Sequence, residues 1–241
     1  MSRKIRIAIS GTYSTGKSTT TEALSLLTGI PRTYARTMRE LLPVYIPGKT
    51  LEQCTPFELF ELGMRRFNER AVNESKEKDS YITDGSSIHE YVYGLARLKT
   101  GMNPNASKVE QFLSRMKMLP FKKIVEGVNN SFGQIAKSHA KENYDVFIHL
   151  PVEFPLQADG HRPFNESFRE ICNELLLETI NELNIESYVI NGSIEERLEK
   201  MIDIFSFEPV MSIENAVNEA KRRVKIATKE KEKPIPLLVS I

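Results

Sequence analysis

A glycine-rich stretch near the N-terminus has the residue types and the spacing that hold a phosphate chain. The stretch consists of Gly11, Thr12, Tyr13, Ser14, Thr15, Gly16, Lys17, Ser18 and Thr19. Its glycines let backbone N–H groups curl around an anion, and the N-terminus of the helix that follows adds partial positive charge. Lys17 would place a cation on the β and γ phosphates, and Ser18 would offer a hydroxyl ligand to Mg²⁺. The pattern predicts a P-loop that takes ATP and Mg²⁺ as cofactors.

Asp84 ends a short segment, Tyr81 to Asp84, that is expected to be a strand. Ligands of open α/β sheets gather at the carboxyl ends of the strands. A carboxylate there can hold Mg²⁺ through water or accept a proton from an attacking hydroxyl. We therefore expect Asp84 to be a catalytic or metal-side acid. The alternative is an aspartate that only caps the turn before the next helix.

An arginine lies in a proline-bounded loop after a further expected strand. The segment Asp159-Gly160-His161-Arg162 falls within residues 152–165, which we expect to form a lid. A guanidinium carried in by a closing lid stabilises the charge that develops on a transferring phosphoryl group. Lys17, Asp84 and Arg162 are thus the predicted catalytic residues. An ordinary Asp-Gly surface turn is the alternative for this loop.

Tyr34, Arg36 and Arg39 lie at or just after the end of a short expected strand at 30–36, on the same edge as Asp84. Arg36 could bind an acceptor phosphate or pair with a carboxylate, and Tyr34 could stack on a ring. We assign these three residues to the substrate side, with a solvated amphipathic turn as the alternative.

Other residues near these segments are left without an assigned chemistry. His89 and Glu90 are as compatible with the core or with solvent as with substrate contact. Arg65 and Arg66 are expected at the surface. On the same helix, the spacing of Phe57, Phe60, Met64, Phe67 and Ala71 predicts the buried face.

Strands and helices alternate along the chain, and this order positions the candidate residues. Strands are expected at 4–10, 30–36, 81–84, 144–150 and 187–191. Helices are expected at 17–27, 36–42, 55–78, 88–99, 107–120, 121–142, 165–183, behind Ser193 and from about 212 onward. Such alternation predicts a three-layer α/β sandwich of the P-loop NTPase class, with helices on both faces of a parallel sheet. We expect residues 1–208 to form the kinase domain, with a helical insert at 101–142, and residues 209–241 to form a basic helix and tail.

Composition narrows the function classes. The chain has 241 residues, 40% of them hydrophobic and 27% charged, with a net charge of +1. This balance argues against broad non-specific nucleic-acid binding. Cys54 and Cys172 lack metal or redox spacing, and no apolar run is long enough to span a membrane. We expect a cytoplasmic protein without a disulfide framework.

Together these segments resemble the nicotinamide riboside kinase domain. They also resemble the small AAA/P-loop ATPase and kinase domains of NAD metabolism, which are kin of deoxynucleoside and thymidylate kinases. The resemblance covers roughly residues 4–205 and is strongest at 10–40 and 144–200.

The resemblance implies roles for individual positions. It implies Lys17 and Ser18 for triphosphate and Mg²⁺, Asp84 as base or metal-side acid, and Arg162 as the lid arginine. It also implies that Gly192 and Ser193 border the adenine. The chain departs from its kin after Asp84, where Gly85-Ser86-Ser87 replaces the arginine-containing segment of those kinases.

The leading hypothesis is an ATP-dependent phosphotransferase acting on a small hydroxylated acceptor, most readily a nucleoside-like one. The alternatives are a nucleoside monophosphate kinase and an ATP-hydrolysing switch that controls a partner. A nucleic-acid end-kinase would use Lys221, Arg222, Arg223 and Lys225. That reading is disfavoured, because a terminal charge run is more often a solvated helix. The sequence is also compatible with a homodimer.

Overall fold

Five strands form one parallel sheet in the order β2-β3-β1-β4-β5. The structure is a computed structural model that describes residues 4–101, 103, 105–155 and 165–231. The strands are β1 (Arg6–Ser10), β2 (Arg32–Thr33), β3 (Tyr81–Asp84), β4 (Val146–His149) and β5 (Glu186–Val189). The predicted parallel α/β sheet is confirmed.

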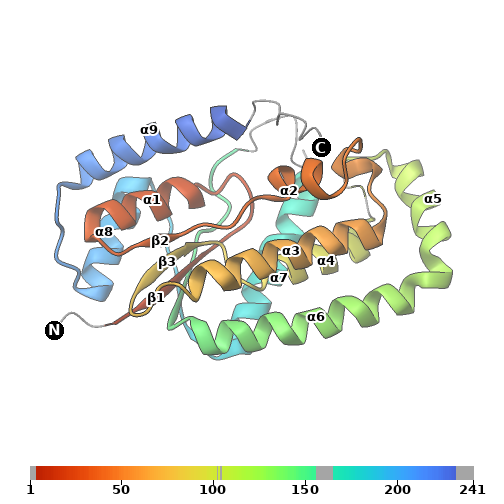
Figure 1. Cartoon of the computed structure of the whole chain (residues 1–241), viewed down its shortest axis with the longest axis horizontal. Coiled ribbons are helices and arrows are strands. Elements are labelled where there is room, and N and C mark those ends of the chain that lie inside the picture. The colour runs from red at the N-terminus through yellow and green to blue at the C-terminus, as the bar shows by residue number, and fades with distance from the viewer. Residues whose placement is uncertain (1–3, 102, 104, 156–164, 232–241) are drawn as a thin grey trace, which may run out of the picture.

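Helices connect the strands and cover both faces of the sheet (Figure 1). They are α1 (Lys17–Thr28), α2 (Met38–Tyr45), η1 (Leu51–Gln53), α3 (Pro56–Glu74), α4 (His89–Thr100), α5 (Lys108–Met118), η2 (Leu119–Phe121), α6 (Lys122–Asn143), α7 (Glu166–Leu183), α8 (Ile194–Phe205) and α9 (Ile213–Lys231).

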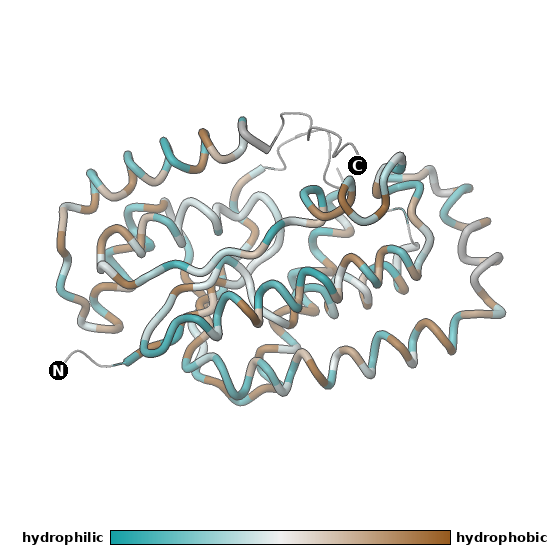
Figure 2. The backbone as a smooth tube through the Cα atoms, viewed as in Figure 1, coloured by the Kyte–Doolittle hydropathy of each residue, from teal (hydrophilic) through white to brown (hydrophobic). Residues whose placement is uncertain are grey.

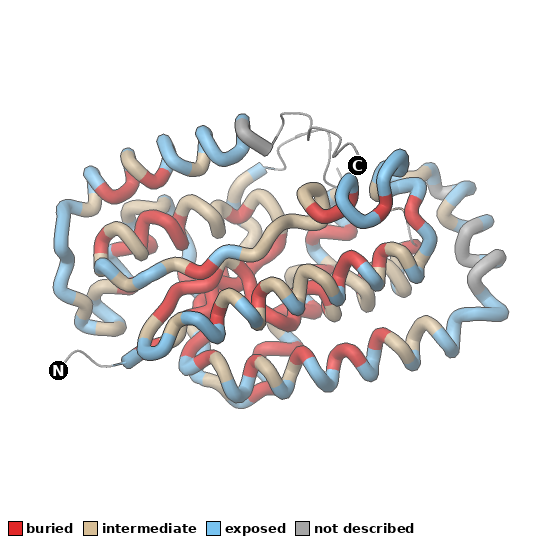
Figure 3. Tube along the Cα trace, viewed as in Figure 1, coloured by how far each residue is buried: buried red, intermediate tan, exposed pale blue. Residues whose placement is uncertain are grey.

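The central strands alternate their side chains between two apolar layers. Ile7 and Ile9 of β1 pack with Leu24 of α1 in a core that α8 and α9 complete. Ala8 of β1 and Phe147 of β4 face the other way, into a core shared with α4 and α7. Because side chains alternate along a strand, one sheet buries both faces. Figure 3 shows the buried residues gathered around these strands.

The register of the sheet brings two sequence-distant strand ends together. Ile9 of β1 lies opposite Asp84 of β3, and Ser10 lies opposite His149 of β4. The loop that follows Ser10 and the acid that ends β3 therefore share one edge of the sheet. This juxtaposition positions the site.

Beyond that edge, helices α2, α3, α4 and α6 build a second, helical part of the molecule (Figure 1). Hydrophobic positions recur along α3 and α6 between hydrophilic ones (Figure 2). The predicted face of α3 packs only in part. Phe60 and Phe67 lie against Phe132 of α6, but Phe57 and Met64 are 55% and 45% exposed, and Leu59 and Leu62 on another side are buried. Apolar residues occupy two sides of α3, so spacing alone did not select the side that packs.

The C-terminal helix α9 packs against α1 rather than standing apart. Its Ala216, Val217 and Ala220 are buried in the core that also contains Leu24 and Leu27 of α1. The rest of the expected tail, residues 232–241, lies outside the described residues. Among the helices that the structure describes, none has the length and apolar character needed to cross a membrane.

Candidate functional site

The loop between β1 and α1 has a backbone that favours glycine at two positions. Gly11 has φ of 140° and Gly16 has φ of 83°, both in the region that favours glycine. A Cβ on Gly11 would lie 2.6 Å from the backbone oxygen of Leu150. Inside the loop, the Thr15 hydroxyl donates to the Thr12 carbonyl oxygen at 2.9 Å. The loop and the first residues of α1 line the cavity at the place where a helix N-terminus would favour an anion.

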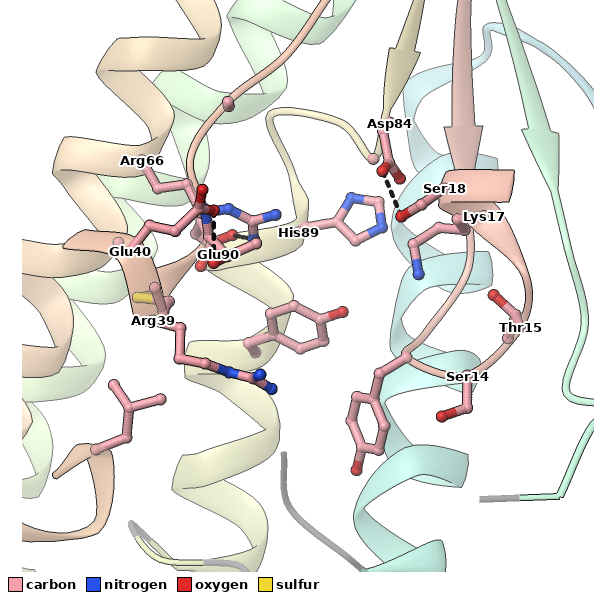
Figure 4. Close-up of a pocket in the computed structure, with 18 of the residues that line it drawn as sticks. Ser14, Thr15, Lys17, Ser18, Arg39, Glu40, Arg66, Asp84, His89 and Glu90 are labelled. Carbon is pink, nitrogen blue, oxygen red and sulfur yellow. Dashed lines mark hydrogen bonds and ion pairs between the residues drawn. The ribbon is translucent and has the colours of Figure 1, made fainter. Parts of the chain in front are cut away.

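Lys17, Ser18 and Asp84 meet beside this loop (Figure 4). The Ser18 hydroxyl donates to Asp84 Oδ2 at 2.6 Å, and the Lys17 ammonium donates to the Thr12 carbonyl oxygen. Mg²⁺ prefers oxygen ligands and commonly takes one or two from protein and the others from phosphates and water. The Ser18–Asp84 pair fits this donor set. Among the described residues no group of three or more His, Cys, Asp or Glu side chains could hold a metal without such help.

Asp84 is half-buried and stays ionised. Burial opposes the charge of its carboxylate, but Lys17, the Ser18 hydroxyl, Arg32 and Arg70 outweigh that effect and hold its pKa below the ordinary value of 3.8. An ionised acid beside a P-loop serine is suited to a cation site. It is less suited to remove a proton, because a base works best with a pKa near the working pH.

Arg70 of α3 fixes the end of β3 from behind. Its guanidinium donates to Thr83 Oγ1 at 2.5 Å and to the Asp84 carbonyl oxygen at 3.0 Å. Gly85 has φ of 90°, and a Cβ there would lie 3.1 Å from Arg70 Nη2. The strand end and its turn are therefore held by a buried arginine. Sequence reasoning missed this residue, because one arginine on an amphipathic helix normally signals a solvated position.

His89 ties the turn after β3 to the P-loop. The Ser86 N–H donates to His89 Nδ1 at 2.9 Å, so that nitrogen carries no proton. Nε2–H then donates to the Gly11 carbonyl oxygen at 3.2 Å. Burial, with Lys17, Arg70 and Arg66 nearby, lowers the pKa of His89 well below 6.5, so the ring is neutral. The residue that the sequence left unassigned is a positioning residue in the core.

Arg197 of α8 supports the loop from the opposite side. The side chain is fully buried; Nη1 donates to the Thr15 carbonyl oxygen at 2.7 Å and Nη2 lies 2.9 Å from Glu153 Oε2. Glu153 also accepts a hydrogen bond from the Gly192 N–H at 2.9 Å. Arg197 therefore joins the P-loop, the end of β4 and the loop after β5. The sequence alone gave no role to this arginine.

A cavity of about 850 Å³ opens at the P-loop and continues into the helical part of the molecule. At its phosphate end lie Gly16, Lys17, Ser18 and Asp84. At its far end the walls are largely apolar and come from α3, α4 and α6, including Leu59, Phe60, Leu98, Val128 and Phe132. Figure 4 shows His89 between the two groups of polar residues that the cavity contains.

A buried ion pair provides polar groups at the far end. Arg66 of α3 pairs with Glu90 of α4, and their side chains are 18% and 5% exposed. The second carboxylate oxygen, Glu90 Oε2, is buried without a hydrogen-bond partner. The prediction that Arg66 lies at the surface is wrong, whereas Arg65 does lie there and pairs with Glu61. The carboxylate partner that draws Arg66 inward is distant in sequence, so no local pattern revealed it.

The comparisons with known proteins fit this architecture. The family model described as an AAA domain matches residues 6–197. The chain belongs to the AAA domain family. The matched region of this AAA domain contains the P-loop, Asp84, the Arg66–Glu90 pair and Arg197, and it ends before α9. A search of curated proteins found no match.

Solved structures share the fold of this AAA domain. Deoxyadenosine kinase from M. mycoides with bound dATP is 15% identical and has a TM-score of 0.56, with 84% of this chain and 99% of that chain covered. The same enzyme with bound dCTP is 13% identical with a TM-score of 0.53 and the same coverage. The NadR protein in complex with NR is 14% identical with a TM-score of 0.51, and 88% of this chain covers 53% of that chain. The predicted likeness to P-loop kinases of these groups is confirmed at the level of the fold.

The predicted substrate-side residues of the AAA domain occupy different places. Tyr34 and Arg39 line the cavity, and the Tyr34 hydroxyl donates to Glu40 at 2.6 Å. Arg36 does not line it; its guanidinium pairs with Glu69. Of the two roles considered for Arg36, the structure displays the carboxylate pair.

The expected lid arginine, Arg162, lies outside the described residues, as do most of residues 152–165. Phe154 is described and lies beside the P-loop, with its ring centroid 5.1 Å from the Arg197 guanidinium. The start of the expected lid therefore passes next to the phosphate end of the cavity.

Proposed function

We propose that this protein is an ATP-dependent phosphotransferase that moves the γ-phosphoryl group to a small, hydroxylated acceptor of nucleoside-like size. The observation that supports it best is the continuity of the cavity. The phosphate cradle and the apolar chamber between α3, α4 and α6 open into one another. A nucleotide switch needs the cradle alone, whereas a transferase needs a second chamber that faces the γ-phosphate.

The phosphate end would bind the triphosphate. Backbone N–H groups of the P-loop and Lys17 would hold its oxygens, and Ser18 with Asp84 would hold Mg²⁺ on the β and γ phosphates. When bound, the cation neutralises charge on the phosphate oxygens. Asp84 could act as a metal-side acid or as a base, and its low pKa supports the metal-side role. Arg162 stays a predicted contributor from the lid.

The chamber would select the acceptor by shape and by a few polar groups. Aromatic rings such as Phe60 and Phe132 offer apolar surface to a base or a similar ring, which is how small-molecule sites usually gain affinity. Glu90 Oε2, buried and unpartnered, would accept a hydrogen bond from an acceptor hydroxyl. The chamber thus suits a molecule with one apolar face and at least one hydroxyl.

One ion pair in the chamber favours a nucleoside over a nucleoside monophosphate. Arg66 is already neutralised by Glu90, so a phosphate on the acceptor would have to compete with that carboxylate for it. Arg39 and Arg97 also line the cavity, whereas Arg36 does not. The solved structures of similar fold support the same direction, since deoxyadenosine kinase and NadR with bound NR are among them.

A screen of ATP consumption against nucleosides, nucleoside monophosphates and other hydroxylated metabolites tests the proposal. Product mass identifies the phosphorylated compound. We expect strong stimulation by one nucleoside-like class and little by monophosphates. Slow turnover that no acceptor stimulates would favour the ATPase switch and overturn the transferase.

A further inference from the structure

The C-terminal helix α9 lies outside the region that matches the AAA domain, yet it runs along the helix that carries the P-loop serine. Near its start, the Val210 N–H donates to the Leu27 carbonyl oxygen at 2.8 Å, at the far end of α1. Further on, Arg223 reaches Glu22 of α1 at 3.1 Å. The helix is therefore antiparallel to α1 and approaches the P-loop as it proceeds (Figure 1).

Packing fixes α9 at this place. Ala216 and Ala220 are completely buried, and their small side chains let the two helix axes approach closely. The pair Arg223–Glu22 adds a charged contact one turn beyond Ser18, and Glu22 also pairs with Arg32. The position of the helix relative to the phosphate end is thus set by buried contacts as well as by surface charges.

The next turn of α9 contributes to the wall of the cavity. Val224, Ala227 and Thr228 line it, together with Ile194 at the start of α8 and Phe154 after β4. Phe154 is close to the cradle, because a Cβ on Gly16 would lie 3.5 Å from its ring. An apolar slot between α8, α9 and Phe154 therefore adjoins the place where the triphosphate would bind.

We propose that α9 forms one wall of the nucleotide-base site. Val224 and Ala227 would face the base of the bound nucleotide, with Phe154 and Ile194 on the other side. Flat aromatic bases gain affinity from apolar walls of this kind. The proposal rests on the proposed nucleotide binding but not on transfer to an acceptor. It makes the C-terminal helix, which the family match does not include, part of the ATP site.

Binding of ATP and of inorganic tripolyphosphate, each with Mg²⁺, tests this assignment. Ala227→Trp would fill the slot. The matched control is Ile226→Trp. Ile226 directly precedes Ala227 on the same helix, is 43% exposed and does not line the cavity. We expect Ala227→Trp to weaken ATP binding about tenfold or more and to leave tripolyphosphate binding within about twofold of wild type. Ile226→Trp should change neither affinity.

A milder variant distinguishes loss of the apolar wall from a folding defect. Val224→Ser removes apolar surface without adding bulk, so it should weaken ATP binding about threefold to tenfold and again spare tripolyphosphate. ATP binding unchanged in both cavity variants would overturn the assignment, and so would equal losses for both ligands. Failure of the proposed nucleotide binding is distinguishable, since the wild-type protein would then bind neither ligand.

Discussion

The two ends of the cavity are built in different ways. The phosphate end is made from one continuous loop, whose shape depends on the glycines at 11 and 16, plus a single acid, Asp84, from the adjacent strand. The acceptor end is made from side chains of α2, α3, α4 and α6, spread between residues 38 and 132. The comparison teaches that phosphate recognition is encoded locally by backbone geometry, whereas acceptor recognition is encoded by long-range packing.

The largest effect is expected at the phosphate end. Lys17→Ala removes the cation that would meet the β and γ phosphates, so kcat should fall about 10²–10³-fold and ATP affinity should fall with it. Steady-state kinetics with ATP titration measures both. Lys4→Ala is the control, because Lys4 forms an exposed pair with Asp79, does not line the cavity and should leave activity unchanged. A Lys17→Ala variant with wild-type turnover would remove the P-loop from the mechanism.

Asp84→Asn tests the acid next to it. The substitution keeps the shape and removes the charge that would hold Mg²⁺, so we expect kcat to fall about 100-fold and the Mg²⁺ concentration needed for half-maximal rate to rise. Thermal unfolding should show an intact fold. If kcat falls but the Mg²⁺ requirement is unchanged, Asp84 is a base for the acceptor hydroxyl rather than a metal-side acid. A stable variant with near-normal kcat would leave Asp84 with only a structural role.

At the acceptor end, Glu90→Gln should weaken binding of the acceptor and leave binding of ATP unchanged. We expect the acceptor KM to rise about tenfold while the ATP KM stays within about twofold, because the lost hydrogen bond faces the chamber. The same change leaves Arg66 buried without its counter-charge, at a cost of about 3–5 kcal/mol in stability.

A paired variant separates these two consequences. Replacing Arg66 with Met together with Glu90→Gln removes the uncompensated charge, so thermal stability should recover. The acceptor KM should stay high. Recovery of both properties would show that Glu90 acts only through folding and would remove it from the acceptor site.

Neutral histidines near the strand ends predict a pH dependence of stability. Burial is the main cause that lowers the pKa of His149 to about 4 from 6.5, and it acts in the same direction on His89. As the pH falls below about 6.5, the unfolded chain binds protons that the folded chain excludes. The free energy of unfolding should therefore fall by up to about 1.4 kcal/mol per pH unit for each such histidine.

Unfolding curves between pH 7.5 and 5 measure this effect. His149→Gln should flatten the decline, because glutamine does not titrate and can still reach Asn173, which lies 3.0 Å from His149 Nε2. A variant with the same pH slope as wild type would contradict the proposed origin of the dependence.

The smallest effect is expected from the end of the chain. Deletion of residues 229–241 removes the Lys-Glu alternation and the final apolar residues but spares Val224, Ala227 and Thr228 of the proposed base wall. Acceptor phosphorylation should stay near wild type, since chain ends with alternating lysine and glutamate usually contribute little packing. Early melting or loss of activity would show that these residues are structural.

The same contrast explains what the sequence could predict. The succession of strands and helices along the chain and the P-loop followed from short-range signals, namely apolar runs, glycine positions and helix caps. Asp84 followed from the rule that ligands meet at strand ends. These features depend on residues that are neighbours in sequence or on one simple property of parallel sheets.

The missed residues have partners that are remote in sequence. Arg197 is 44 residues from its carboxylate partner Glu153, and Arg66 is 24 residues from Glu90. Charged residues on helices are usually solvated, so composition and spacing gave both arginines the wrong or no role. Only the packing of α3 on α4, and of α8 beside the P-loop, turns these side chains inward.

The destination of the γ-phosphoryl group tests the central account most directly. ATP labelled in that group, incubated with the acceptor selected by the screen, yields either labelled acceptor or labelled inorganic phosphate. If the two ends of the cavity work together, most of the label should appear in the acceptor, and Asp84→Asn should reduce that transfer about 100-fold. Label that appears almost entirely in inorganic phosphate, with or without acceptor, would contradict a transferase and leave a P-loop ATPase.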